Sequence, residues 1–252
     1  MALGKGKIVC LFGVKGGIGK SILSMNLAGV ASNKNIKTLI IDMDIYGGSI
    51  GFALNQKANK TIYNFVDDYN NNRYKDLKDY IVNYNDSIDY IIAPKDPRQS
   101  NKILSNYLEL LIDKAKFNYE LIIIDTNHIL NETNLCILDK CDEILLVMSN
   151  NIFDMKNMKN LISIFNDLDK KNYKLLLNES ITNNDGYFNL YDIKDIIKNN
   201  IDYVISSKFY VKNIDELIVN GNIITLIDKY KKLKDYKVLD NIIIECMGDN
   251  NE

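Results

Sequence analysis

The sequence predicts an α/β fold in which a doubly wound, mostly parallel sheet carries helices on both faces. Short, wholly apolar runs recur along the 252 residues, and segments with helical periodicity separate them. Runs that are apolar throughout are typical of parallel strands covered on both faces. Alternation of strands and helices implies right-handed crossovers, and ligands of such folds bind beyond the carboxyl ends of the strands.

The apolar runs set the expected strands, and the periodic segments set the expected helices. Strands are predicted at 7–12 (KIVCLF), 38–42 (TLIID), 90–93, 121–125 (LIIID), 144–148 (ILLVM) and 174–178 (KLLLN). A helix is predicted from about Ser21 to Ser32, directly after a glycine-rich loop. One further apolar stripe consists of Ile103, Leu104, Tyr107, Leu108 and Leu111, and another runs from Val238 to Cys246.

Composition indicates one large domain over residues 1–252. The chain is 46% hydrophobic, which suits a single α/β core of this length. A net charge of −2 favours neither nucleic acid nor an anionic membrane as a partner. Residues 1–6 form a lead into the first strand, and they are either a natural start or the remnant of a linker from an absent N-terminal domain.

Cysteine usage and hydropathy indicate a cytoplasmic protein. Cys10, Cys136, Cys141 and Cys246 include no C-x-x-C pair, so metal or redox chemistry is unsupported. Buried free cysteines fit a reducing compartment. No apolar run approaches the roughly 18 residues of a membrane span, and no signal peptide is recognisable after Met1.

The loop FGVKGGIGKS, residues 12–21, is the strongest motif in the chain. Gly16, Gly17 and Gly19 permit successive backbone N–H groups to point inward as an anion nest, and the following helix adds its positive end. Lys20 can reach the β- and γ-phosphates of a nucleotide, and the Ser21 hydroxyl can ligate Mg²⁺. The strict G-x-x-x-x-G-K pattern fails at its first glycine, because that position is Val14.

Aspartates follow two of the expected strands. Asp42 and Asp44 are two residues apart on an extended segment, so their side chains are expected on one side. Asp125 ends an apolar strand in the manner of a Walker B aspartate, which can hold a water on Mg²⁺. A plain strand-end turn for Asp44 and a turn cap for Asp125 remain the alternatives.

The segment KGGIGKS resembles the deviant Walker A motif of the MinD/ParA class of P-loop NTPases, the SIMIBI class. The resemblance implies an ATPase that uses ATP or ADP with Mg²⁺ and forms a homodimer with nucleotide between its subunits. It also implies that Lys15 acts across the dimer on the partner's phosphates, with a solvated loop lysine as the alternative. Nucleotide contacts are then expected from Gly16, Gly17, Ile18, Gly19, Lys20, Ser21 and Ile22.

The same resemblance assigns the remaining site residues. Asp44 falls in switch I near the attacking water, which makes Lys15, Lys20 and Asp44 the expected catalytic residues. Ser21, Asp44 and Asp125 become the expected metal site. Asn178 matches a family asparagine that recognises adenine, although it is also one asparagine among many in this chain.

One departure from the family pattern affects the expected nucleotide site. The family often has a proline soon after the Walker B aspartate, where this chain has TNHIL, so the geometry of switch II is open. His128 lies in that segment and is expected to be solvated or packed rather than a base.

Three segments resemble the CpaE/TadZ branch, which positions pilus-assembly machinery. They are DMDIYGGSIGFALN, IIAPKDPR and CDEILLVMSNNIFDMKNMKNLISIF. This implies a switch that positions a Flp/Tad-type pilus or secretion assembly, hydrolyses ATP slowly without a partner, and is recruited to the membrane or cell pole through partners. The alternatives are a ParA-type partitioning ATPase that binds DNA non-specifically and a MinD-like division-site protein.

The C-terminal region carries neither a clear membrane-targeting helix nor a strong DNA-binding signal. The final residues are acidic and lack Trp or Phe, so the stripe from Val238 to Cys246 is expected to pack on the core. The lysines of 228–237 alternate with aspartates, which is typical of a solvated helix face. A cluster-binding reductase is disfavoured, because the four cysteines lie in apolar segments.

Overall fold

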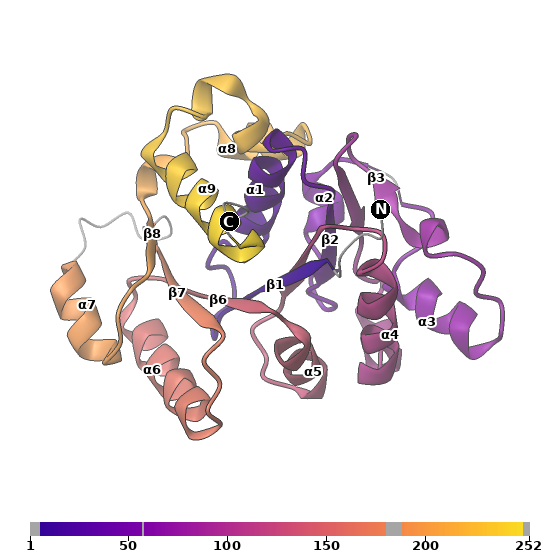
Figure 1. Ribbon diagram of the computed structural model, residues 1–252, viewed down its shortest axis with the longest axis horizontal. Helices are drawn as coiled ribbons and strands as arrows, with labels where there is room; N and C mark the ends of the chain where they lie inside the picture. Colours follow the sequence, from indigo (N-terminus) through magenta and orange to yellow (C-terminus); the bar gives the residue numbers. More distant parts are fainter. Residues whose placement is uncertain (1–5, 57, 180–187, 249–252) are drawn as a thin grey trace.

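The computed structural model describes residues 6–56, 58–179 and 188–248. Their sheet has eight strands in the order β3-β4-β2-β5-β1-β6-β7-β8 (Figure 1). Only β3 and β4 pair antiparallel, and every other neighbouring pair is parallel. The strands are β1 (Lys7–Phe12), β2 (Thr38–Met43), β3 (Val82–Asn83), β4 (Ile88–Ile91), β5 (Leu121–Thr126), β6 (Glu143–Met148), β7 (Tyr173–Asn178) and β8 (Tyr203–Ile205).

Helices cover both faces of the sheet. Figure 1 shows α4, α5, α6 and α7 below the sheet and α1, α8 and α9 above it. The helices are α1 (Lys20–Asn33), α2 (Ile50–Ala53), α3 (Ile62–Asn70), α4 (Ser105–Ala115), α5 (Glu132–Lys140), α6 (Ile152–Asp167), α7 (Leu190–Ile197), α8 (Ile214–Val219) and α9 (Lys234–Met247). The doubly wound, mostly parallel sheet predicted from the sequence is confirmed.

Each face of the sheet has its own apolar core. In β1, Ile8, Cys10 and Phe12 face the core made with α3 to α7, whereas Val9 and Leu11 face the core made with α1 and α9. This alternation along one strand places helices on both sides of it. The central strands β2 and β5 are buried along their whole length, which explains why their sequences are apolar throughout.

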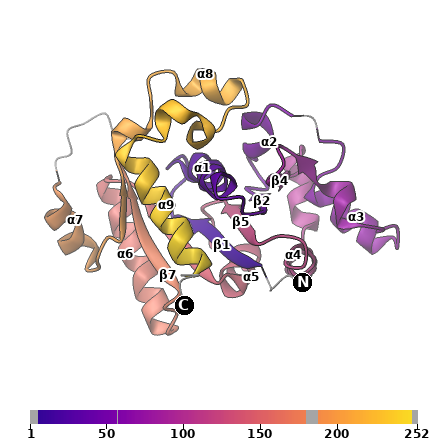
Figure 2. The same ribbon diagram turned by 45° about the horizontal axis from the view of Figure 1, so that its top comes forward.

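Helix α1 is buried on nearly all sides, and this fixes the start of the helix under the glycine-rich loop. In Figure 2, α9 lies along α1 and over β1. A methyl group built on Gly29 would lie 2.2 Å from Oγ1 of Thr225, so only glycine allows η5 (Ile224–Leu226) to pack this closely. Thr225 also donates from its backbone N–H to Oδ1 of Asn26 at 3.0 Å.

The C-terminal stripe packs as the sequence predicts. Leu239, Ile242 and Ile243 of α9 are buried in the core shared with α1. Among the described residues, no helix is both long enough and apolar enough to cross a membrane.

The sequence prediction missed two strands and misplaced one stripe residue. β3 and β8 have two and three residues, which is too short for a periodicity to appear. Leu104 was expected on the apolar stripe of α4, yet it is 56% exposed because it is the N-cap before the helix begins. Residues 1–5, most of the predicted lead, lie outside the described residues.

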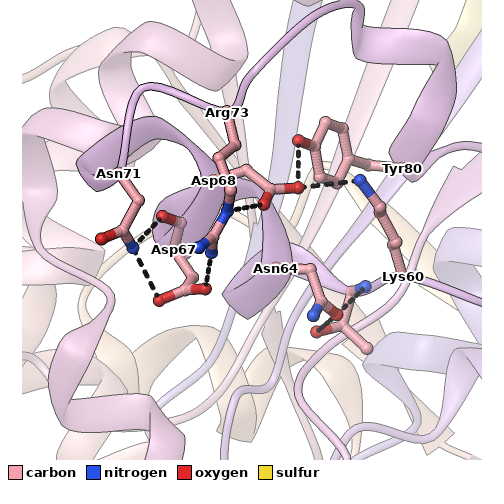
Figure 3. A network of polar contacts seen from close by, with 8 residues as sticks. Lys60, Asn64, Asp67, Asp68, Asn71, Arg73 and Tyr80 are labelled. Atoms are coloured by element: carbon pink, nitrogen blue, oxygen red, sulfur yellow. Dashed lines mark hydrogen bonds and ion pairs between the residues drawn. The ribbon is translucent and has the colours of Figure 1, made fainter.

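A polar network around Asp68 joins α3 to the chain on both sides of it, to Lys60 before the helix and to Arg73 and Tyr80 after it (Figure 3). Oδ2 of Asp68 accepts hydrogen bonds from Nζ of Lys60 and from the Tyr80 hydroxyl, both at 2.8 Å. Oδ1 accepts from Nε of Arg73 at 3.0 Å. These donors lower the pKa of Asp68 to about 2, with the Lys60 and Tyr80 bonds as the largest causes.

We expect Asp68→Asn to lower the free energy of unfolding by about 1 kcal/mol near neutral pH, because the charged acceptor for these donors is lost. An Asp with a depressed folded pKa contributes stability above its unfolded pKa and loses it as pH falls through the folded pKa. The difference between wild type and variant should therefore shrink from about pH 4 to about pH 2. Urea unfolding across that range measures it.

The control is Asp169→Asn. Asp169 and its partner Lys171 are 81% and 83% exposed, and Asn tolerates the positive φ at this position. This control should leave the unfolding midpoint unchanged. If the difference in free energy of unfolding between wild type and Asp68→Asn is the same at every pH, the stabilisation does not come from the charge of Asp68.

Candidate nucleotide site

The glycine-rich loop lies between β1 and α1, where two glycines adopt backbone conformations that other residues rarely adopt. Gly17 and Gly19 have φ of 72° and 87°, and Gly19 is the N-cap of α1. A Cβ on Gly19 would lie 2.6 Å from Nδ2 of Asn178 and 2.7 Å from the Tyr210 hydroxyl oxygen. Gly19 is therefore required both for its conformation and for the close approach of Asn178 and Tyr210 behind the loop.

A cavity of about 390 Å³ opens in front of this loop, at the carboxyl ends of β1, β2 and β5. Seven of the eight residues predicted to contact nucleotide, Gly16 to Ile22, line it, and the eighth, Asn178, does not. The other lining residues come from segments distant in sequence and are Met25, Asp44, Ser49, Phe52, Ala53, Thr126, Asn127, His128 and Ile218. Parallel sheets bind ligands at this edge, so the cavity is where the fold predicts a ligand.

Lys20 lies buried at the start of α1 with three carboxylates around it. It is only 7% exposed, and burial lowers the pKa of its ammonium group. The negative charges of three carboxylates oppose this lowering of the pKa and favour the charged ammonium; they are Asp125, Asp44 and Asp154, in decreasing order of strength. Such a buried cation beside a nest of backbone N–H groups suits a polyphosphate.

Asp125 and Asp42 lie opposite each other on neighbouring strands β5 and β2. Burial raises the pKa of Asp125 to about 6, while the Ser21 hydroxyl and the Lys20 ammonium act against that rise. Oδ1 of Asp125 accepts from the Ser24 hydroxyl at 3.3 Å. Oδ2 of Asp125 is buried and has no hydrogen-bond partner among the described residues, which leaves it open to a water or a cation.

Asp42 has a structural role in the turn after β2. Its two oxygens accept from the backbone N–H groups of Asp44 and Ile50, each at 3.1 Å. Burial, and then the charge of Asp125, raise its pKa well above the usual range. These bonds shape the turn after β2 and leave Asp44 half-buried in the cavity wall.

The residues present fit a Mg²⁺ ion whose remaining coordination positions are filled by phosphates and waters. No group of three or more His, Cys, Asp or Glu side chains suited to a metal occurs in the described part of the chain. Mg²⁺ in nucleotide sites is usually held by one or two protein oxygens together with phosphates and waters. Ser21 lies near Asp125, whose Oδ2 has no hydrogen-bond partner in the part of the chain that the structure describes, and both side chains offer oxygen ligands of the right kind.

Asp154 belongs to the site, although sequence reasoning missed it. Its carboxylate is buried at the start of α6 and accepts from the backbone N–H and hydroxyl of Ser149, at 2.7 and 2.8 Å. Burial raises its pKa, and the charges of Lys15 and Lys20 oppose this. Lys15 itself is exposed. The available signal was Ser149, Asn151 and Asp154 directly after an apolar strand, a pattern typical of a helix start.

Asn178 lies behind the loop rather than in the cavity wall. It is fully buried at the end of β7, and its Nδ2 donates to the carbonyl of Ile18 and to the Tyr210 hydroxyl, both at 2.8 Å. Recognition of adenine by Asn178 stays a prediction. His128 is exposed, as expected, and borders the cavity beside Gly16.

Two proteins of the archaeon Methanocaldococcus jannaschii align with the chain. One protein is 30% identical over 128 residues, which are 47% of this chain and 49% of that protein. The chain thus matches about half the length of this relative. An ATP-binding protein is 27% identical over 244 residues, which are 92% of this chain and 83% of that protein.

Solved structures share the fold over nearly the whole chain. The ParA family ATPase of Chlorobium tepidum has a TM-score of 0.80 at 18% identity, over 94% of this chain and 98% of that one. MinD of Pyrococcus horikoshii in complex with Mg-ADP has a TM-score of 0.75 at 20% identity, over 94% of each chain. The AAA domain family matches residues 6–182, from the first strand through the strand that carries Asn178. The chain therefore belongs to the AAA domain family, and its fold is that of MinD/ParA-type P-loop NTPases.

Proposed function

We propose that residues 1–252 form one ATPase domain that acts as an ATP-dependent dimerising switch. The observation that carries the proposal is the cavity in which Gly16 to Ile22, buried Lys20 and Asp44 converge. ATP with Mg²⁺ is the ligand that suits this set, because the loop and Lys20 offer donors for phosphates and Ser21 and Asp125 offer oxygens for the metal.

Each residue then has a defined role. Lys20 binds the β- and γ-phosphates, and Asp44 orients the attacking water from the turn after β2. Mg²⁺, when bound, supplies positive charge to the β- and γ-phosphates, with Ser21 and Asp44 as ligands and Asp125 holding a water on it. Asn178 is proposed to recognise adenine.

A second copy of the chain completes the proposed site. Lys15 is exposed, whereas Lys20 on the same loop is buried. Several large apolar side chains are exposed: Phe52, which lines the cavity, and Phe153, which precedes Asp154, are each 72% exposed. Ile129 and Leu130, which follow the lining residue His128, are 44% and 41% exposed. Exposed apolar side chains gathered near a charged cavity are typical of an interaction surface. We infer that the partner subunit covers them and places its Lys15 on the phosphates.

The proposed switch positions a Flp/Tad-type pilus or secretion assembly, and hydrolysis resets the dimer. The CpaE/TadZ-like segments of the sequence support this finer assignment. Turnover is proposed to be slow without an assembly partner, which would also recruit the cytoplasmic protein to the membrane or cell pole. Partitioning and division-site roles are the alternatives, and retention on DNA that falls steeply with salt would favour the partitioning role.

Replacement of Asp44 by alanine tests the switch. The loop, Lys20 and Ser21 remain for binding, while the group that orients water is lost, so the variant should accumulate as an ATP-bound dimer. Hydrolysis should fall at least about 100-fold. Size-exclusion chromatography with light scattering, in ATP–Mg²⁺ and in ADP–Mg²⁺, measures the oligomeric state.

The matched control is Asp195→Ala, since Asp195 is 67% exposed on α7 and pairs only with nearby Lys198 among the described residues. It should behave as the wild type in both nucleotides. An Asp44→Ala variant that stays monomeric in ATP, or that hydrolyses ATP at the wild-type rate, would exclude the proposed role.

A further inference from the structure

Asn127, the first residue after β5, is a polar side chain in the cavity wall that the proposed reaction has not used. It is only 4% exposed and lines the cavity between Thr126 and His128. The sequence prediction left this segment open, because the residues after Asp125 depart from the family pattern.

The backbone of Ile129 fixes the orientation of the Asn127 amide. The N–H of Ile129 donates to Oδ1 of Asn127 at 2.9 Å, and Nδ2 of Asn134 donates to the same oxygen at 2.8 Å. Nδ2 of Asn134 also donates to the carbonyl of Ile129 at 2.6 Å. Because a backbone N–H only donates and a carbonyl only accepts, flipping either amide would lose these bonds. The oxygen of Asn127 is therefore committed to the protein.

The nitrogen of the same amide has no acceptor among the residues that the structure describes. Nδ2 of Asn127 is buried and has no hydrogen-bond partner within the described ranges. An unpaired buried donor costs roughly 1–3 kcal/mol, so such atoms are rare and call for an explanation. A donor held rigidly in the wall of a ligand cavity is suited to an acceptor on the ligand.

The charges nearby identify which part of a ligand reaches Asn127. Lys20, the residue that binds the β- and γ-phosphates in such loops, faces Asp125, two residues before Asn127. On the other side, a Cβ built on Gly16 would lie 3.4 Å from Nδ1 of His128, the residue after Asn127. Asn127 therefore lines the same cavity as Lys20 and Gly16, and we expect the outermost phosphate of a nucleotide on this side of the cavity.

We propose that Nδ2 of Asn127 donates a hydrogen bond to an oxygen of the terminal phosphate of a bound nucleoside triphosphate. The inference rests on the proposed nucleotide binding and adds a residue that distinguishes triphosphate from diphosphate. ADP lacks the accepting oxygen, so only the triphosphate satisfies this donor. Ile129 and Asn134 act as positioning residues, because they hold the amide in its orientation.

The test compares Asn127→Ala with Asn127→Asp. Aspartate keeps an oxygen for Ile129 and Asn134 but replaces the donor with a charged acceptor beside a phosphate. Calorimetry with Mg²⁺ should show a roughly 10-fold loss of affinity for a non-hydrolysable ATP analogue in the alanine variant, and a larger loss in the aspartate variant. Affinity of the alanine variant for ADP should stay within about twofold of wild type.

Two readouts separate this role from a structural one. A water shared between Asn127 and Oδ1 of Asn134, which is also buried and unpaired among the described residues, predicts an unchanged ratio of analogue to ADP affinity. That result would overturn the inference. A second result would also overturn it: the aspartate variant binds the analogue as tightly as wild type, while the alanine variant binds neither nucleotide and melts at a lower temperature in the absence of nucleotide. Asn157→Ala, at an exposed position on α6, is the control and should match wild type.

Failure of the inference and failure of the proposed function give different results. If the wild type binds both nucleotides and the variants keep its affinity ratio, only the role of Asn127 is wrong. If the wild type binds neither nucleotide, the proposed function is wrong and the inference is overturned with it.

Discussion

Replacement of Lys20 by alanine is expected to weaken ATP binding at least about 100-fold, because two or more charge-assisted hydrogen bonds to phosphate are lost together. Lys20 is buried, and burial lowers the pKa of its ammonium group, so the cation is poorly hydrated before nucleotide arrives. A cation that has already lost its water gains more from a polyphosphate than an exposed lysine would. Calorimetric titration with ATP–Mg²⁺ measures the loss.

The three carboxylates that face Lys20 require a control for folding. Without the ammonium, Asp125, Asp44 and Asp154 would repel one another, and the variant could bind poorly because it is destabilised. Lys20→Met keeps most of the side-chain volume, and a thermal melt without nucleotide checks both variants. Lys34→Ala, at the other end of α1 where Lys34 pairs with Asp240, should bind ATP as wild type does. Equal ATP affinity in wild type and a folded Lys20 variant would refute the site.

The parts of the fold that the sequence predicted are those determined by local pattern. β1 and β5 were predicted to within a residue, since a central parallel strand must be apolar on both faces. The loop was equally visible, because its glycines and Lys20 are required at fixed spacing. The short edge strands β3 and β8 could not be found, since their existence depends on the neighbours they pair with.

The site residues that escaped prediction depend on contacts between distant segments. Asp154 enters the site because α6 begins beside the loop, and nothing in its own segment indicates the distance to Lys15 or Lys20. Asn127 matters because Ile129 and Asn134 occupy its oxygen, which only tertiary structure reveals. Asn178 was predicted to recognise adenine, and its contacts with the loop carbonyl and Tyr210 could not be inferred from a strand-end asparagine.

Replacement of Lys15 by alanine should leave ATP binding to the monomer nearly intact but abolish ATP-dependent dimerisation. Lys15 is exposed, while Lys20 and the loop N–H groups remain to hold the nucleotide in its own subunit. Across a dimer, two nucleotides would face each other without the charge that Lys15 supplies. Hydrolysis should then fall by roughly 10³-fold or more, as it does on loss of an arginine finger. Calorimetry, light scattering and phosphate release measure the three effects separately.

Mixing two inactive variants decides whether Lys15 acts on its own subunit or on the partner. In a dimer of one Lys15→Ala chain and one Asp44→Ala chain, the site with an intact Asp44 belongs to the Lys15→Ala chain, and its partner still carries Lys15. Hydrolysis should therefore return at one site per mixed dimer if the lysine acts in trans. If it acts only within its own subunit, each site lacks one residue and no activity returns. Native mass spectrometry must first establish that mixed dimers form, and inactivity of those dimers would then exclude action across the interface.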